Sequence, residues 1–488
     1  MLSHLRNYAS AGAVTGFVGL ISFPILTRNL TVAEYGIVGL ITASLTMFIA
    51  VGKLGVQHAV IRFYAQIKHG NIDFSMNQLN STVSVIFFCL ASMTTLLWLG
   101  SGLFVLPNVM QYEGLASLFA LASGIVFIRL MGSGAINFLR ARQSSGDVAV
   151  VESLSRCLNV AFIVFMLLLS TLNPWSVIAC MLIAEVVGVS YAFYCYSSNF
   201  HFKFEDISPS LAKTMLFYSM PLMILESLEL VIRLSDRYMI EAMIGASALG
   251  QYSASYNLAT YIDLIVLVAM VQALKPAYML MWESEGRAAT QVFLAKFLRV
   301  YLIAGIPFVT MFAITAPHLL GFLAGPKYAP GTVIIPYLAI SNLLQGSMHI
   351  LTAGLYIFKD TKSLVMWSFI ATVTNIALNF IFIPKFGILG AAMMTLFAFA
   401  IFTAGVSYSA FRLVSFPILL RIPLLMAVAS IATFWLLNTL SFGNDAVNFF
   451  AKGLIGTILL LLVMWLVEPE VRFWITKRIQ TLRGIKEA

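Results

Sequence analysis

The chain has 488 residues, of which 60% are hydrophobic and only 10% are charged. Soluble domains carry roughly 25% charged residues, so a chain this poor in charge could not cover its surface in water. The net charge of +9 would suggest nucleic acid in a soluble protein. Here the basic residues lie in short loops between apolar segments, so membrane lipids rather than nucleic acid are the expected partner.

Apolar runs recur along the whole chain, and each approaches the length of about 20 residues that a spanning helix needs. The runs are unbroken rather than alternating, which favours helices over a closed barrel. The sequence therefore predicts an all-α integral membrane protein of about fourteen transmembrane helices. The predicted spans are 9–27, 36–56, 79–105, 114–136, 150–170, 174–197, 214–234, 248–272, 294–316, 331–357, 363–383, 387–411, 420–440 and 447–467.

Basic residues are divided unevenly between alternate loops. The two termini and every second loop hold 21 of the 29 Lys and Arg residues. The intervening loops hold six, namely Arg28, Arg233, Arg237, Lys327, Lys385 and Lys452. Because loops rich in Lys and Arg remain in the cytoplasm, both termini are expected to be cytoplasmic.

The sequence also repeats itself weakly. The segment around Gly36 matches the one around Gly250, and GVSYAFY at Gly188 matches GVSYSAF at Gly405. We interpret these matches as two pseudo-symmetric six-helix lobes, with chance similarity between apolar segments as the alternative. A substrate path would then lie between the lobes. The predicted parts are a lobe over 1–205, a lobe over 206–415, and two extra helices with a basic amphipathic cytoplasmic tail over 416–488.

Ten charged residues, inside the predicted spans or close to their ends, form the set that we expect at membrane depth. A charge at bilayer depth costs at least about 2.5–3.5 kcal/mol, so each should be paired or should face a polar cavity. We assign the four arginines to substrate binding and the six acids to a polar cavity or to ion coupling. The arginines are Arg129, Arg156, Arg233 and Arg237, and the acids are Glu152, Glu185, Glu226, Glu229, Asp236 and Asp263.

Half of these charges belong to the seventh span and its end. Glu226, Glu229, Arg233 and Asp236 follow the spacing i, i+3, i+7, i+10, which places them along one face of a helix. Such a face lines a hydrated path or a partner helix rather than lipid. Glu229 and Arg233 also form an i,i+4 acid–base pair, and the alternative is a salt bridge that only holds helices together.

Three further residues carry separate expectations. Glu152 and Arg156 are another i,i+4 pair, with the same two interpretations. Arg129 has no partner nearby in the sequence, which favours a functional role. Arginine suits phosphate because its planar fork binds oxygens bidentately and remains charged.

Patterns typical of enzymes are missing from the sequence. There is no GxxxxGK[ST], HExxH or GxSxG, the six histidines have no ligand spacing, and no CxxC occurs among the four cysteines. We therefore expect no cofactor, no metal site and no enzymatic activity.

Three segments carry a resemblance to a known family. They are FPILTRNLTVAEYGIVGLITA from Phe23, LVIRLSDRYMIEAMIGASALGQYSASYNLA from Leu230, and IPKFGILGAA from Ile383. In this order they resemble the polysaccharide-repeat (Wzx-type) flippases of O-antigen and exopolysaccharide synthesis. Those proteins belong to the multidrug/oligosaccharidyl-lipid/polysaccharide exporter superfamily.

The resemblance implies a flippase in the plasma (inner) membrane of a bacterium. It would move undecaprenyl-pyrophosphate-linked oligosaccharide from the cytoplasmic to the outer leaflet by alternating access, with polysaccharide polymerase machinery as a further partner. On this interpretation the four arginines contact pyrophosphate or acidic sugars. Arg129→Ala is then expected to abolish surface glycan without reducing the abundance of the protein.

Three alternatives remain open. They are a cation-coupled exporter of drugs on the same fold, a flippase for peptidoglycan precursors, and a membrane polymerase or ligase for glycans. Drug sensitivity, loss of viability, and accumulation of unpolymerised repeat in the outer leaflet of a deletion strain would indicate these three respectively.

Overall fold

The computed structural model describes residues 2–110, 112–197, 202–262 and 268–468. Every regular element in those ranges is helical, and eleven helices are long and apolar enough to cross a membrane. The bent helix α9 brings the number to twelve, and the other two predicted spans fall on α1 and α10. The predicted all-helical architecture is confirmed, with about fourteen spans as an approximate count.

The chain divides into two compact units. Unit 1 comprises residues 1–254 and 368–391, and unit 2 comprises residues 255–367 and 392–488. The boundaries of these units differ from those of the lobes expected from the sequence repeat. The two lobes, and a substrate path between them, therefore stay a prediction. The amphipathic tail expected at the C-terminus lies outside the described residues.

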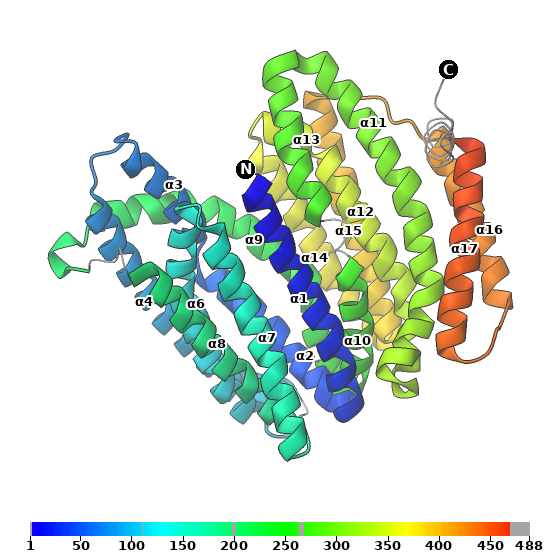
Figure 1. Cartoon of the computed structure of the whole chain (residues 1–488), viewed down its shortest axis with the longest axis horizontal. Coiled ribbons are helices and arrows are strands. Elements are labelled where there is room, and N and C mark those ends of the chain that lie inside the picture. The colour runs from blue at the N-terminus through cyan, green and yellow to red at the C-terminus, as the bar shows by residue number, and fades with distance from the viewer. Residues whose placement is uncertain (1, 111, 198–201, 263–267, 469–488) are drawn as a thin grey trace, which may run out of the picture. The chain divides into compact units, whose positions relative to one another are not determined.

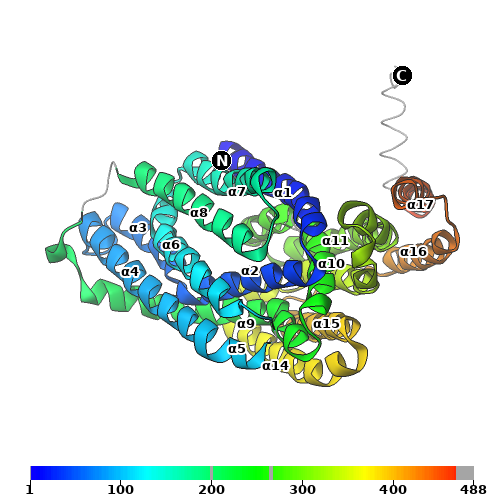
Figure 2. The same ribbon diagram turned by 90° about the horizontal axis from the view of Figure 1, so that it is seen from below.

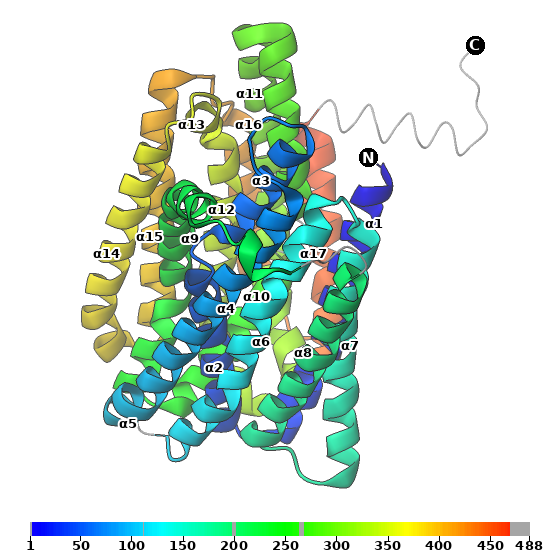
Figure 3. The same ribbon diagram turned by 90° about the vertical axis from the view of Figure 1, so that its left-hand side faces the viewer.

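In unit 1, the helices α4, α6, α8 and α7 pack against one another in that order, and α1 packs against α7 (Figures 1 and 2). The short helix α3 follows α2 and lies against both α6 and α9 (Figure 3). The elements of this unit are α1 (Leu2–Asn29), α2 (Val32–Gly52), α3 (Val56–Lys68), α4 (Met76–Gly100), η1 (Ser101–Val105), α5 (Leu106–Val109), α6 (Leu115–Ala141), α7 (Ser145–Leu169), α8 (Pro174–Ser197), η2 (Phe204–Asp206), α9 (Pro209–Met243), and parts of α10 (Ala246–Ile262), α14 (Thr361–Phe386) and α15 (Ile388–Leu413).

Helix α2 begins with a capping box. The Thr31 hydroxyl accepts from the Glu34 amide, and the Glu34 carboxylate accepts from the Thr31 amide. Two amide donors at the helix start are thereby satisfied, which fixes where the helix begins. One turn further on, α2 crosses α10 so closely that a Cβ on Gly36 would lie 2.4 Å from the carbonyl oxygen of Ala246.

Helix α9 is bent. Its two parts, Pro209–Pro221 and Met223–Met243, differ in direction by 43°. Proline has no amide hydrogen to donate to the preceding turn, which accounts for the bend. The bend separates an initial part of α9 from the part that carries the predicted charges, Glu226 to Arg237.

Unit 2 contains the long helix α11, which is broken at Gly286 (φ 80°, ψ −168°), a conformation that glycine alone adopts readily. Helices α16 and α17 pair with each other and pack on α11 (Figure 1). The elements of this unit are α11 (Val268–Ala324), η4 (Pro326–Ile334), α12 (Ile335–Leu351), α13 (Ala353–Ile357), α16 (Arg421–Thr439), α17 (Asp445–Val467) and the remaining parts of α10, α14 and α15.

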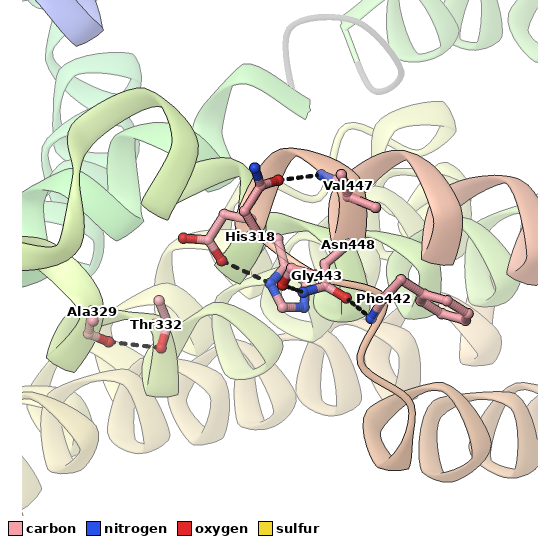
Figure 4. A network of polar contacts seen from close by, with 9 residues as sticks. His318, Ala329, Thr332, Phe442, Gly443, Val447 and Asn448 are labelled. Atoms are coloured by element: carbon pink, nitrogen blue, oxygen red, sulfur yellow. Dashed lines mark hydrogen bonds and ion pairs between the residues drawn. The ribbon is translucent and has the colours of Figure 1, made fainter.

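A polar network caps the start of α17 (Figure 4). Asn444 accepts from the amide of Val447, and Asn448 accepts from the amide of Phe442 at 2.8 Å. The imidazole Nδ1 of His318 on α11 lies 3.1 Å from the carboxylate of Asp445. These contacts satisfy donors at the helix start and join α17 to α11 inside unit 2.

Candidate polar site in unit 1

Nine of the ten predicted site residues lie on four helices of unit 1. Arg129 is on α6, Glu152 and Arg156 are on α7, Glu185 is on α8, and the remaining five are on α9. Asp263 lies outside the described residues. The structure thus brings most of the predicted charges into one compact unit, although they form separate clusters.

Arg129 and Glu185 form an ion pair between α6 and α8. A guanidinium nitrogen lies 2.5 Å from a carboxylate oxygen, and the side chains are 21% and 15% exposed. At this depth each charge offsets much of the cost of burying the other. The partner that Arg129 lacks in its own sequence neighbourhood is therefore supplied by a residue 56 positions away.

Glu152 pairs across the hairpin between α6 and α7. Its carboxylate lies 2.7 Å from the guanidinium of Arg140, near the last turn of α6. The sequence predicted Arg156 as the partner of Glu152, whereas the contact that the structure shows is to Arg140. Arg156 lies exposed on α7.

Glu226 on α9 meets two side chains of α3. The His58 Nε2 atom lies 2.7 Å from one carboxylate oxygen, and the Gln57 amide donates to the other at 3.1 Å. The side chains of His58 and Glu226 are about two-fifths exposed (40% and 42%), so this ion pair lies at the surface of α3 and α9 rather than deep in the unit. The contact joins α3 to the part of α9 that follows the bend.

The far end of the charged face of α9 is buried. The Arg237 guanidinium donates to the carbonyl oxygen of Gly39 on α2 at 3.2 Å, and the Tyr252 hydroxyl of α10 donates to Asp236. Asp236 and Arg237 are almost fully buried. These contacts anchor α9 to α2 and α10. Glu229 and Arg233, between the two ends, are half-buried.

A polar face on α14 was missed by the sequence reasoning. Ser368, Thr372, Asn375 and Asn379 are all buried, and their spacing puts them on one side of the helix. The Thr372 hydroxyl donates to the carbonyl oxygen of Leu228 at 3.3 Å, so this face lies against α9 within unit 1. The i, i+4, i+7, i+11 recurrence of polar residues in an apolar run was the signal that could have revealed it.

Lys53 was also missed, because it was counted as an ordinary loop cation. It lies just beyond the end of the spanning helix α2, in the turn that leads into α3, and it is half-buried. Burial first, and then the positive charges of Arg140 and Arg129, lower the pKa of Lys53 to about 8, against an opposing effect of Glu226. The position of Lys53 inside the apolar run 36–56 was the available signal.

The described residues contain no group of three His, Cys, Asp or Glu side chains that could hold a metal ion. What they do contain is a set of helices able to span a bilayer, with ion pairs and hydrogen-bonded charges between them. These features define the class of the protein as a multi-pass, all-helical membrane protein.

Residues 5–282 match the polysaccharide biosynthesis protein family, and the chain belongs to that family. The resemblance found in the sequence is thereby confirmed at the family level. A curated relative is the succinoglycan biosynthesis transport protein ExoT of Rhizobium meliloti (strain 1021), which is 25% identical over 336 residues. The match covers 67% of this chain and 64% of ExoT, slightly less than two thirds of that relative's length.

Solved structures of two transporter types share the fold. The lipid II flippase MurJ in an inward closed conformation matches with a TM-score of 0.75 and 14% identity, over 94% of this chain and 98% of MurJ. An inward-facing multidrug resistance MATE family transporter matches with a TM-score of 0.71 and 12% identity, over 83% of this chain and 94% of the transporter. At these identities the likeness establishes the fold.

Proposed function

We propose that this protein flips an undecaprenyl-pyrophosphate-linked oligosaccharide from the cytoplasmic to the outer leaflet of a bacterial plasma membrane, for surface polysaccharide synthesis. The observation that carries the proposal is the family match over residues 5–282, which include the ion-paired charges of α6, α7, α8 and α9. The MurJ-like fold supports a flippase over an enzyme.

The physical task explains why charges inside the helices matter. A sugar diphosphate cannot enter hydrocarbon unaided, because burying its charges without partners is prohibitive. Cations held within the membrane protein lower that cost, while the lipid tail stays in the bilayer. Arg129, Arg156, Arg233 and Arg237 are proposed to contact the diphosphate or acidic sugars, in an alternating-access cycle.

The test is deletion in the native host, with surface polysaccharide and lipid-linked intermediates assayed together. We expect loss of surface glycan, with undecaprenyl-linked repeats accumulating on the cytoplasmic side, and restoration of both by a plasmid copy. Unchanged glycan and intermediates, in a strain without a second flippase, would exclude this substrate class.

A second candidate is a cation-coupled exporter of small molecules, which the fold shared with the MATE transporter favours. The titratable contact between His58 and Glu226 is where a proton could be carried in that case. Drug sensitivity of the deletion strain, with normal surface glycan, would support this candidate.

A further inference from the structure

A groove lies between α3 and the initial part of α9 (Pro209–Pro221), within unit 1. Its volume is about 470 Å³. Two residues of α3 and four of α9 line it, namely Arg62, Phe63, Thr214, Phe217, Tyr218 and Pro221. Sites for small ligands measure about 300–1,000 Å³, so this groove has room for a headgroup and the adjoining part of a chain.

The α9 side of the groove is apolar and open. Thr214, Phe217 and Pro221 follow the spacing i, i+3, i+7, which places them on one face of the helix. The Thr214 hydroxyl donates to the carbonyl oxygen of Ser210 in its own helix, and the Phe217 side chain is 84% exposed. A phenylalanine this exposed is costly in water, whereas hydrocarbon solvates it. This wall therefore suits an acyl chain.

Arg62 supplies the charge of the groove. Its guanidinium carbon lies 4.3 Å from the centre of the Tyr218 ring, and that ring meets Phe63 edge-on. The cation–π contact holds the guanidinium in place, while its N–H donors point outward in the plane of the group. Among the residues that the structure describes, no carboxylate oxygen lies within 4.0 Å of this guanidinium.

The charges around the groove favour an anion. The residues that line it include no acidic side chain. Lys213, one helical turn before Phe217, is exposed and adds a second cation on the same side of α9. Glu226 lies on the part of α9 after the bend, where His58 and Gln57 already bind its carboxylate. A negatively charged headgroup would therefore complement this surface.

The predicted orientation sets the depth of the groove in the membrane. Helix α3 follows the spanning helix α2, and the loop charges predict that this end of α2 is cytoplasmic. Helix α3 buries one face and exposes the other, including Arg62 and Lys68, as an interfacial helix does. The cytoplasmic leaflet is rich in anionic lipids, whose phosphates lie at this depth.

We propose that the groove binds an anionic phospholipid of the cytoplasmic leaflet, with its phosphate on Arg62 and an acyl chain along Phe217 and Pro221. The inference goes beyond the proposed function, because this lipid is a resident ligand rather than the cargo. Helix α3 already contacts the second part of α9 through Glu226. A lipid in the groove would join α3 to the initial part as well, and would thus stabilise the bend.

The experiment is photolabelling of the full-length protein in nanodiscs of phosphatidylcholine. Two probes are compared, phosphatidylglycerol and phosphatidylcholine, each with a diazirine near the top of one acyl chain and each added as a small fraction. Peptide mass spectrometry measures labelling of Pro209–Pro221 relative to the exposed Leu454 and Leu461 of α17. We expect about tenfold more relative labelling by the phosphatidylglycerol probe, which is the effect of one charge-assisted contact.

Substitutions of Arg62 test its part in this preference. Arg62→Gln should lower the relative labelling by phosphatidylglycerol about tenfold, since the charged donor is lost. Arg62→Lys should retain a preference for phosphatidylglycerol, reduced about two- to threefold because lysine lacks the planar fork. Lys68→Gln is the matched control, at an exposed lysine of α3 that does not line the groove, and should label like the unmodified protein.

Melting temperatures show that the variants are folded. In pure phosphatidylcholine, Arg62→Gln should unfold at the temperature of the unmodified protein, because the side chain is exposed. Added phosphatidylglycerol should raise the melting temperature of the unmodified protein more than that of Arg62→Gln, since a ligand of the folded state stabilises it.

Three results would overturn the inference. The first is equal relative labelling of the unmodified protein by both probes, and the second is a full preference for phosphatidylglycerol in Arg62→Gln. The third is displacement of the probe by inorganic phosphate, or by undecaprenyl diphosphate more readily than by unlabelled phosphatidylglycerol, because the occupant would then be a free anion or the cargo. None of these measurements depends on glycan transport, so the proposed function is tested separately.

Discussion

The ion pair between Arg129 and Glu185 ties a predicted substrate ligand to the stability of the fold. Removing the guanidinium alone leaves a mostly buried carboxylate without its partner. A fully buried pair costs about 3–5 kcal/mol when it is broken this way, and the partial exposure here reduces the expected cost to about 2–3 kcal/mol. The earlier expectation that Arg129→Ala leaves abundance unchanged is therefore revised.

We expect Arg129→Ala to lower both membrane abundance and the apparent melting temperature in detergent. Arg129→Leu combined with Glu185→Leu should recover both, because an apolar pair of similar size replaces the two charges. Fluorescence-detected size exclusion after heating gives the melting temperature. If the single variant Arg129→Ala is as stable as the unmodified protein, then burial of the Glu185 carboxylate does not require this arginine as a partner.

The double variant also separates stability from transport. If it restores abundance but surface glycan remains absent, then Arg129 has a role beyond holding α6 to α8. If surface glycan returns with abundance, Arg129 leaves the set of proposed substrate ligands. The assay is quantitation of surface polysaccharide in the deletion strain, with expression matched by immunoblot.

Residues that carry charge were readily found in the sequence, but their partners were not. Rules for neighbours on one helix paired Glu152 with Arg156, whereas its carboxylate contacts Arg140 of the preceding helix. The pairing depends on how α6 and α7 fold back on each other, which no local spacing encodes. The same limit hid Glu185 as the partner of Arg129 and made Lys53 look like an ordinary loop cation.

At the scale of elements, α2 and α10 meet through glycines that have no room for a side chain. A Cβ on Gly250 would lie 1.8 Å from the carbonyl oxygen of Val32, and one on Gly36 would lie 2.6 Å from the amide nitrogen of Gly250. The two glycines that the sequence matched as equivalent positions thus lie against each other within unit 1. Backbone atoms form the contact, so a larger residue must force the helices apart.

We expect Gly250→Ala to destabilise the protein by at least about 2 kcal/mol, since overpacking a close contact typically costs this much. Gly36→Ala should behave similarly. Gly100→Ala is the matched control, because nothing lies within 4 Å of a Cβ at the end of α4. Melting temperatures of the three purified variants provide the comparison, and equal values for Gly250→Ala and Gly100→Ala would contradict the close crossing.

The spans themselves were well predicted, because bilayer thickness and hydrophobicity act on each segment separately. Bends were only partly predictable. Pro221 marks the bend in α9, whereas the break in α11 at Gly286 lies in a polar segment where many glycines form ordinary turns. The buried polar face of α14 could have been found from its spacing, but its contact with α9 required the tertiary fold.

For the whole molecule, the loop charges make a prediction about orientation. Asp73, in the loop between α3 and α4, should face the cytoplasm, and Ser170, between α7 and α8, should face outward. Both residues are exposed. Single cysteines placed at each position, in a chain whose four native cysteines are replaced, report the side by reaction with a membrane-impermeant maleimide.

We expect Ser170→Cys to react in intact spheroplasts and Asp73→Cys to react only after lysis. The reverse result would place both termini outside. Labelling of both cysteines in intact spheroplasts would contradict the predicted number of spans from α4 to α7. The compact units could not be predicted in this way, because they depend on contacts between distant segments rather than on the hydrophobicity of any one of them.

The half-buried position of Lys53 has a consequence for chemical labelling. An amine acylates only in its neutral form, and at pH 7 about a tenth of a lysine with a pKa near 8 is neutral, against less than about 0.1% of an ordinary lysine. A short pulse of an acylating reagent should therefore modify Lys53 ahead of the exposed lysines, as peptide mass spectrometry can measure. Electrophiles shaped to reach the α2–α3 turn would then distinguish this lysine from the exposed lysines of the chain.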